Sequence, residues 1–117
     1  MWRQKNYKNL VDYRNVKSHV YGGQSYHSKK EASYAAQLDI LQKAGEIKEW
    51  DRQIEVPLIV NGIKIARYYV DFLVTHKDGR KEYVEVKGWW TDYARLKWRL
   101  FEALYSKKKN VELTVVK

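Results

Sequence analysis

Two turn signals divide the middle of the chain into three consecutive β-rich segments. Asn61-Gly62 is a strong signal for a two-residue hairpin, and Lys77-Asp78-Gly79 suits a three-residue hairpin with glycine in the left-handed position. The segments that flank these turns are rich in β-branched and aromatic residues, which favour strands; they are residues 47–60, 67–75 and 81–87. The sequence therefore predicts an antiparallel meander of three strands.

One helix is predicted before this meander and a second helix after it. Ser28 is a good N-cap for a helix within residues 25–45. Thr91 or Asp92 can cap a second helix over residues 92–106. The meander is thus expected to have a helix on either side of it in the sequence.

The run VELTVV near the end of the chain predicts a last strand. A helical crossover lets this strand return in parallel within the same sheet. The order helix, three strands, helix, strand predicts an α/β fold with a central mixed sheet, built as a single domain over residues 1–117. Residues 1–24 are polar, basic and tyrosine-rich, and we expect a short helix, a DNA-contacting arm or part of a dimer interface there.

Three charged residues lie within the predicted strands, where charges are rare. The second hairpin pairs His76 with Arg80, and five steps further out Asp71 lies opposite Glu85. Cross-strand partners have Cβ atoms about 4.5–5.5 Å apart. Lys87 is two residues beyond Glu85 and therefore points to the same face of the sheet. The hairpin register thus brings two carboxylates and one ammonium together.

This trio has the composition of a metal-dependent site for phosphodiester hydrolysis. Two adjacent carboxylates repel each other unless a cation lies between them, and Mg²⁺ is usually held by one or two carboxylates together with substrate phosphate. The ammonium of Lys87 can orient a water or neutralise phosphate. The alternative is a cross-strand charge cluster in which Lys87 only satisfies Asp71 and Glu85.

Glu31 is a further candidate on the first helix. It stands three residues after Ser28 and so forms a capping box. It also begins the stripe Glu31, Ala35, Leu38, so its carboxylate is expected to lean toward the buried face. A capping role and a role in the site are compatible.

The composition favours a nucleic-acid partner. The chain has 23 basic and 14 acidic residues, a net charge of +9, and the cations are spread along its length. The absence of cysteine excludes disulfides, thiolate zinc sites and cysteine nucleophiles. No apolar run has the length of a membrane span, and the N-terminus lacks the apolar stretch of a signal peptide. We therefore expect a cytoplasmic location and no membrane partner.

Several cationic and aromatic side chains are candidates for DNA contact. Lys97 falls within the predicted apolar stripe of the second helix, where a lysine needs a partner, a function or a route to solvent; that stripe is Tyr93, Leu96, Leu100 and Leu104. Arg95 and Arg99 lie one turn apart on the opposite face and could meet phosphates or only solvent. The full set of DNA-binding candidates is Lys29, Lys30, Gln53, Trp89, Trp90, Arg95, Lys97 and Arg99.

The order of elements, together with Asp71, Glu85 and Lys87, resembles the PD-(D/E)XK nuclease superfamily, which has an αβββαβ core of restriction-endonuclease type. The helix-borne Glu31 matches an additional acid that many members carry, whereas Val70 replaces the usual proline. SKKEASYAAQLDILQKAGEIKEWDRQ, VDF and VEVKGWWT are similar to small phage-encoded members related to Holliday junction resolvases. The resemblance covers about residues 25–117.

The resemblance implies an endonuclease that depends on Mg²⁺, with Mn²⁺ as a substitute. Asp71, Glu85 and the Val86 carbonyl would bind the metal, Lys87 would position or activate the water, and Glu31 would support the metal directly or through water. Gln53 looks like a family position near the site, although it could be a simple strand-surface amide. Trp89 and Trp90 could stack on DNA or be buried.

Three functions follow as hypotheses. The first is a homodimeric Holliday junction resolvase, because the paired strands of a four-way junction suit two symmetric sites. The second is a nicking, flap-cutting or non-specific phage endonuclease of the same fold. The third is a non-catalytic nucleic-acid-binding module, which would leave Asp71, Glu85 and Glu31 unexplained because acids repel phosphate.

Overall fold

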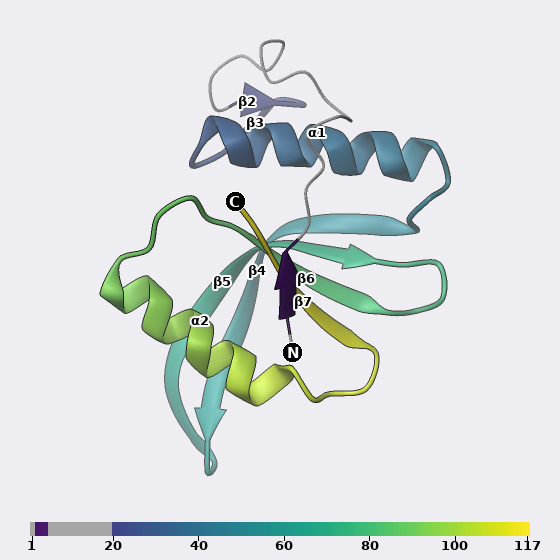
Figure 1. The fold of residues 1–117 in the computed structure, drawn as a ribbon. Helices are drawn as coiled ribbons and strands as arrows, with labels where there is room; N and C mark the ends of the chain where they lie inside the picture. The colour runs from purple at the N-terminus through teal and green to yellow at the C-terminus, as the bar shows by residue number, and fades with distance from the viewer. Residues whose placement is uncertain (1, 5–19) are drawn as a thin grey trace.

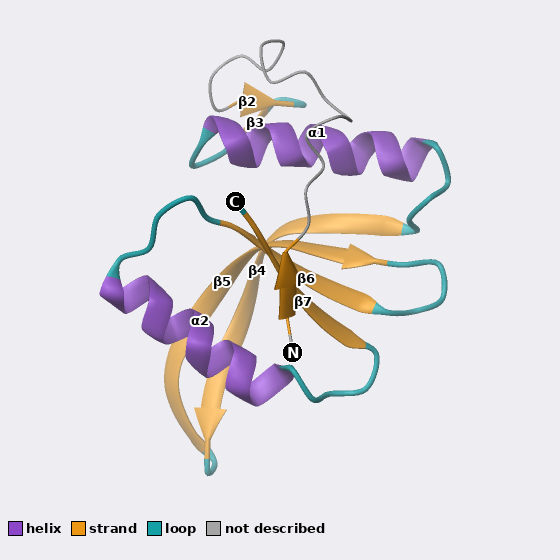
Figure 2. Ribbon diagram, viewed as in Figure 1, coloured by secondary structure: helices purple, strands orange, loops and turns teal. Residues whose placement is uncertain are grey.

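A five-stranded mixed sheet forms the centre of the molecule. The computed structural model describes residues 2–4 and 20–117. The sheet has the strand order β1-β7-β6-β5-β4 (Figures 1 and 2). Strand β5 pairs antiparallel with both β4 and β6, whereas β7 pairs parallel with both β6 and β1. The strands are β1 (Trp2–Gln4), β4 (Glu49–Val60), β5 (Ile63–Thr75), β6 (Lys81–Val86) and β7 (Val111–Val116).

Both hairpins form where the turn signals predict them. Asn61 and Gly62 have φ angles of 51° and 79°, the left-handed pair that a two-residue turn requires to match the strand twist. Gly79 has a φ of 94°, and the N–H of His76 donates to the carbonyl of Arg80 across the second turn. The predicted meander and its register are therefore confirmed.

Two helices complete the fold at the predicted places. Helix α1 (Lys29–Lys43) begins at Ser28, whose hydroxyl accepts from the N–H of Glu31 at 3.0 Å. Helix α2 (Asp92–Tyr105) begins at Thr91, whose hydroxyl accepts from the N–H of Ala94 at 3.0 Å. The α/β mixed-sheet fold is thus confirmed. In the described part of the chain, neither helix combines the length and the apolarity needed to span a membrane.

The helices cover opposite faces of the sheet and create two cores (Figure 1). On β6 the side chains alternate between them, since Val84 packs in the α1 core and Tyr83 packs against the α2 core. Phe72 joins the α1 core, where its ring contacts that of Tyr34 at a centroid distance of 5.2 Å. The sheet therefore contributes one face to each of the two hydrophobic cores.

The predicted apolar stripe of α2 is wrong at its first turn. Tyr93 and Leu96 are 66% and 65% exposed, whereas Trp98 and Phe101 are buried. The rings of Trp98 and Phe101 lie 5.5 Å apart, and Phe101 also meets Tyr68 at 5.4 Å. Because large aromatic rings bury more apolar area than leucine does, they set the rotation of the helix.

The N-terminal segment contributes to the fold where it is described. Strands β2 (Val20–Tyr21) and β3 (Gln24–Ser25) form a small hairpin, and Tyr21 donates its hydroxyl proton to Asp39 of α1 at 2.8 Å. Strand β1 joins the central sheet, and the hairpin contacts α1, so the described parts of residues 1–24 contain strands and not the short helix that was one alternative there. Residues 1 and 5–19 lie outside the described residues, and so do the alternatives predicted for them.

Candidate active site

Asp71 and Glu85 lie side by side where the β5–β6 ladder ends. The last regular pair is Phe72 with Val84, and the same register places Asp71 opposite Glu85. One step further, the N–H of Val86 donates to Oδ2 of Asp71 at 2.8 Å. The carboxylate of Asp71 thus accepts the hydrogen bond that a backbone carbonyl of β5 would accept in a regular ladder. The predicted register places Asp71 and Glu85 next to each other.

The neighbouring strand is also irregular at this level. Arg52 pairs with Phe72 and Ile54 pairs with Val70, which leaves Gln53 between them without a ladder partner. Gln53 has a φ of 50°, an unusual value for a residue other than glycine. Backbone strain of this kind is concentrated at functional sites. By the registers on either side, Gln53 of β4 lies opposite Asp71 of β5, and Asp71 lies opposite Glu85 of β6. These three residues form a row across the three strands.

This row marks the bend of the β4–β5 hairpin. In a regular strand, residues two apart face the same side. On β5, however, Phe72 and Val74 belong to the α1 core, whereas Tyr68 and Val70 belong to the α2 core. Strand β5 therefore passes from one core to the other at Asp71, which places this acid at the junction of the two layers.

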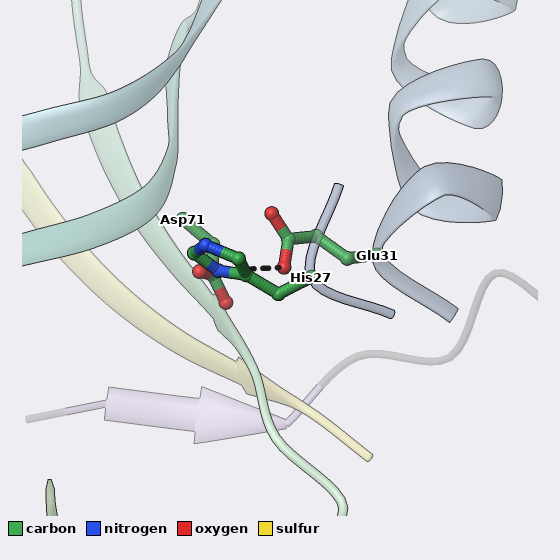
Figure 3. Close-up of side chains that lie close together, drawn as sticks. All are labelled: His27, Glu31 and Asp71. Atoms are coloured by element: carbon green, nitrogen blue, oxygen red, sulfur yellow. Dashed lines mark ion pairs between the residues drawn. The ribbon is translucent and has the colours of Figure 1, made fainter. Parts of the chain in front are cut away.

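Helix α1 delivers Glu31 to the same place, close to Asp71 (Figure 3). Its carboxylate is 3% exposed and accepts from Nε2 of Gln53 at 3.4 Å. Nδ1 of His27 lies 3.8 Å from Oε2 of Glu31. One ligand atom from each of His27, Glu31 and Asp71 lies within 4.8 Å of the other two. The backbone N–H of Glu31 donates to the N-cap Ser28, while its side chain reaches the candidate site.

His27 was missed by the sequence analysis. The available signal was its spacing, four residues before Glu31 and one before the N-cap Ser28. The side chain is 79% exposed, so nothing in the pattern of buried residues pointed to it.

Lys87 and Tyr68 surround the second acid. Nζ of Lys87 lies 3.8 Å from Oε2 of Glu85, and the lysine side chain is 33% exposed. Oε1 of Glu85 is buried and has no hydrogen-bond partner among the described residues, and Tyr68 lies close enough to Glu85 to lower the pKa of this acid. Glu85 therefore presents a buried oxygen that a cation could bind.

Burial and mutual repulsion raise the pKa values of the acids. The pKa of Asp71 is raised to about 8, first by burial and then by the negative charges of Glu85 and Glu31. The pKa of Glu85 is raised to about 7 by burial, which Lys87 opposes. Burial also raises the pKa of Glu31, and this effect is opposed by the neighbouring His27 and Arg52 side chains. Each acid is harder to ionise here than in water.

These residues fit a hard divalent cation. The donors are carboxylate oxygens, which Mg²⁺ and Mn²⁺ prefer. A cation among Glu31, Asp71 and Glu85 would relieve their repulsion and satisfy the unpartnered oxygen of Glu85. The N–H of Val86 donates to Asp71, and the role of its carbonyl as a metal ligand, which the resemblance implies, stays a prediction.

The predicted DNA-binding residues lie in different places. Trp89, Trp90, Arg95 and Arg99 line a hollow that also contains Lys87. Lys97 lines a separate hollow with Tyr93, and its Nζ donates to the carbonyl of Arg67 at 3.1 Å. Lys29 is exposed and Lys30 half-buried in the first turn of α1. Of these predicted residues, the arginine pair and the two tryptophans are grouped beside the candidate active site, and Gln53 lies within it through its contact with Glu31.

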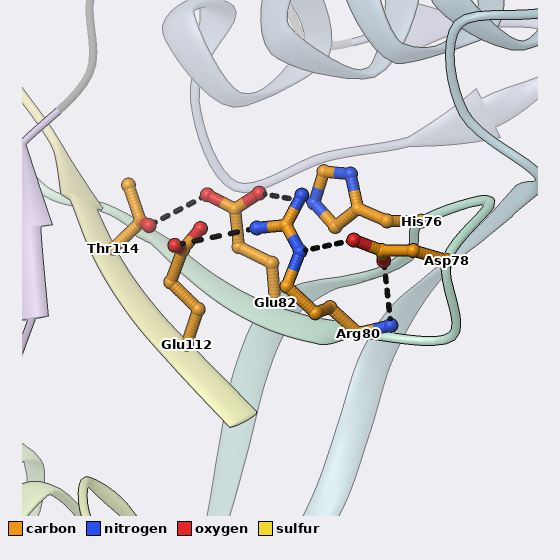
Figure 4. Close-up of polar contacts among 6 residues, drawn as sticks. All are labelled: His76, Asp78, Arg80, Glu82, Glu112 and Thr114. Atoms are coloured by element: carbon orange, nitrogen blue, oxygen red, sulfur yellow. Dashed lines mark hydrogen bonds and ion pairs between the residues drawn. The ribbon is translucent and has the colours of Figure 1, made fainter. Parts of the chain in front are cut away.

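A second acidic cluster lies about 10 Å away, three residues along β6. Glu82 is 1% exposed and is held by Nε2 of His76 at 2.8 Å and by the hydroxyl of Thr114 at 2.6 Å. Arg80 bridges Asp78 and Glu112 at its rim (Figure 4). His76 directly follows β5 and Thr114 lies on β7, so this cluster ties both strands to β6.

The site and the mixed sheet define a small α/β domain with a buried acidic centre. The chain belongs to the family described as "Protein of unknown function (DUF1064)", whose model matches residues 10–117. No curated protein and no solved structure matches it.

Proposed function

We propose that this chain is a Mg²⁺-dependent DNA endonuclease of the PD-(D/E)XK superfamily that cuts four-way junctions. The observation that supports it best is the meeting of four charged side chains at one bend in the sheet: Glu31 lies close to Asp71, the charge of Glu85 raises the pKa of Asp71, and Lys87 pairs with Glu85. A structural charge cluster would be expected to pair each acid fully with cations. Lys87 pairs with Oε2 of Glu85, but Asp71 accepts from a backbone N–H and Oε1 of Glu85 is buried without a hydrogen-bond partner among the described residues.

Glu31, Asp71 and Glu85 would hold the metal, with His27 at its exposed edge. A bound Mg²⁺ ion, or Mn²⁺ as a substitute, supplies an activated water and stabilises the charge that develops on phosphate. The N–H of Val86 fixes the carboxylate of Asp71, and Gln53 fixes that of Glu31. Both contacts orient the acids, which is how surrounding groups tune a metal site.

Lys87 has a different role in this proposal. Its ammonium is partly exposed and lies beside Glu85, where it can orient the attacking water or neutralise the scissile phosphate. The water attacks phosphorus, the bond to the leaving oxygen breaks, and that oxygen takes up a proton. Lys87 therefore acts on the substrate rather than on the fold.

The proposed substrate and assembly rest on charge and symmetry. A net charge of +9, with cations spread along the sequence, favours a polyanionic partner. Contacts from such cations to phosphate carry no base-sequence information, which favours recognition of DNA shape. We propose a homodimer acting in the cytoplasm of a phage-infected host cell, because two symmetric cuts need two copies of one site.

Cleavage of synthetic DNA tests the proposal. The wild-type protein with Mg²⁺ is expected to introduce paired, symmetric nicks into a four-way junction, and Asp71→Asn should lower the rate at least about 100-fold. Flap, linear duplex and single-stranded DNA serve as competing substrates. Preferred cutting of flaps or duplex would assign a different nuclease, and tight binding without cleavage in Mg²⁺ and Mn²⁺ would indicate a binding module. Glu85→Ala with wild-type cleavage would refute the site.

A further inference from the structure

A hollow of about 680 Å³ opens beside Lys87, bounded by the segment after β6, helix α2 and the end of β7. Its volume lies in the range of sites for small organic molecules. Lys87 belongs both to this hollow and to the acidic centre through Glu85. Whatever occupies the hollow is therefore next to the bond that the proposed enzyme would cut.

The charge of the hollow suits a phosphate-bearing ligand. Its cations are Lys87, Arg95, Arg99 and Lys117, against the single acid Glu102. Arg95 and Arg99 are exposed one turn apart on α2, and neither has an ion-pair partner in the described part of the chain. Guanidinium groups bind phosphate in a two-pronged geometry, so this pair can hold consecutive phosphates.

Its aromatic residues suit an unpaired base. Trp89 is 75% exposed, an unusual position for the largest apolar side chain. Trp90 is half-buried and fixed, with its ring 6.2 Å from that of Trp98 and 5.8 Å from Nζ of Lys87. Aromatic faces bind bases of any sequence by stacking. Bases inside a duplex already stack on each other, so these faces select a base that has left the stack.

We propose that this hollow binds one unpaired nucleotide of DNA next to the scissile phosphate, with its base on Trp89 or Trp90 and its phosphates on Arg95 and Arg99. This inference rests on the proposed nuclease function and adds that one base at the branch point of the junction leaves its stack beside the cut. Unstacking a paired base costs a few kcal/mol, and the cost is least where the base is already unpaired. The hollow thus supplies shape selectivity without base-specific contacts.

Binding without metal tests the hollow separately from catalysis. The ligands are a nicked duplex with a one-nucleotide flap of 2-aminopurine and the same nicked duplex without the flap, measured in EDTA. The wild-type protein should bind the flapped duplex about 10-fold tighter, which corresponds to about 1.4 kcal/mol, and should quench 2-aminopurine. Trp89→Ala should lose most of this preference, and Arg95→Ala/Arg99→Ala should weaken flap binding at least about 10-fold.

Lys109→Ala is the matched control, because Lys109 is exposed and lies outside the hollow. It should leave the preference unchanged, and melting curves should show all variants folded, since every replaced side chain is exposed. Equal binding of the two duplexes by the wild-type protein would overturn the inference, as would an undiminished preference in both hollow variants. A flap preference in a protein that fails to cleave would refute the nuclease proposal and leave the nucleotide site standing.

Discussion

Asp71 and Glu85 couple the stability of the fold to pH. The ordinary pKa of an aspartate is 3.8, and that of Asp71 is raised to about 8. Between these pH values the folded chain holds a proton that the unfolded chain has released, so stability falls as pH rises. In EDTA we expect the melting temperature to drop by about 5 °C or more from pH 5 to pH 8.5, as measured by calorimetry.

Asp71→Asn and added metal are the controls for this pH effect. The amide introduced by this substitution carries no ionisable proton, so the variant should show a flatter pH profile and a higher melting temperature at pH 8 than the wild-type protein. Mg²⁺ should raise the melting temperature of the wild-type protein and have little effect on the variant. A melting temperature that rises between pH 5 and pH 8 in EDTA would contradict the raised pKa.

Substitutions of Gln53 separate the effect of its left-handed backbone from the effect of its side-chain amide on the site. Gln53→Gly removes the cost of a left-handed φ but also the contact to Glu31. We expect the free energy of unfolding to stay constant or rise by about 0.5–1 kcal/mol, while junction cleavage slows at least about 10-fold. Urea unfolding and cleavage rates measure the two effects.

Gln53→Asn and Gln53→Val bracket that result. Asparagine keeps an amide and tolerates the left-handed conformation, so it should retain more cleavage than glycine. Valine has no amide and disfavours the left-handed conformation, so it should destabilise the fold by about 1–3 kcal/mol. Full cleavage by Gln53→Gly would show that the amide has no part in positioning Glu31.

The residues of the site could be predicted only in part. The hairpin register fixed the Asp71–Glu85 pair, because side chains in strands repeat every two residues. His27 could not be predicted, since it is exposed and belongs to no periodic stripe. Neither could the bend at Gln53, because the left-handed φ of a residue other than glycine depends on tertiary packing that local sequence does not encode.

At the scale of elements, turns and caps were more informative than apolar stripes. Strands β4 to β7 and both helices begin within a few residues of their predicted positions because their boundaries depend on local chemistry, such as the Ser28 cap and the Asn61-Gly62 turn, whereas β1, β2 and β3 were not predicted. The face of α2 depends instead on which side chains fill the gap above the sheet. Trp98 and Phe101 fill it, so Tyr93 and Leu96 are left in solvent.

The cluster around Glu82 is expected to stabilise the sheet without serving the reaction. His76→Ala removes one partner of a carboxylate that is 1% exposed, and losing a buried hydrogen bond to a charged group costs about 1–3 kcal/mol. We expect that loss in urea unfolding, with junction cleavage by the folded variant unchanged. The exposed pair Asp78–Arg80 is the control, since Asp78→Ala should leave the free energy of unfolding nearly unchanged. Loss of cleavage in folded His76→Ala would instead make this cluster part of the reaction.

For the whole molecule, the number of sites per chain determines the pattern of cuts. The described part of the chain contains one candidate site around Glu31, Asp71, Glu85 and Lys87, whereas resolving a junction requires two cuts on opposite strands. The proposed symmetric dimer would supply the second site. We therefore expect a supercoiled plasmid with an extruded cruciform to become linear in one binding event, with little accumulation of nicked circles, as followed on agarose gels.

In dimers that mix wild-type and Asp71→Asn chains, one site is inactive, and the product should shift to nicked circles. A wild-type protein that releases nicked circles and stays monomeric with junction DNA in sedimentation would contradict the dimer and favour a nicking enzyme with a single site.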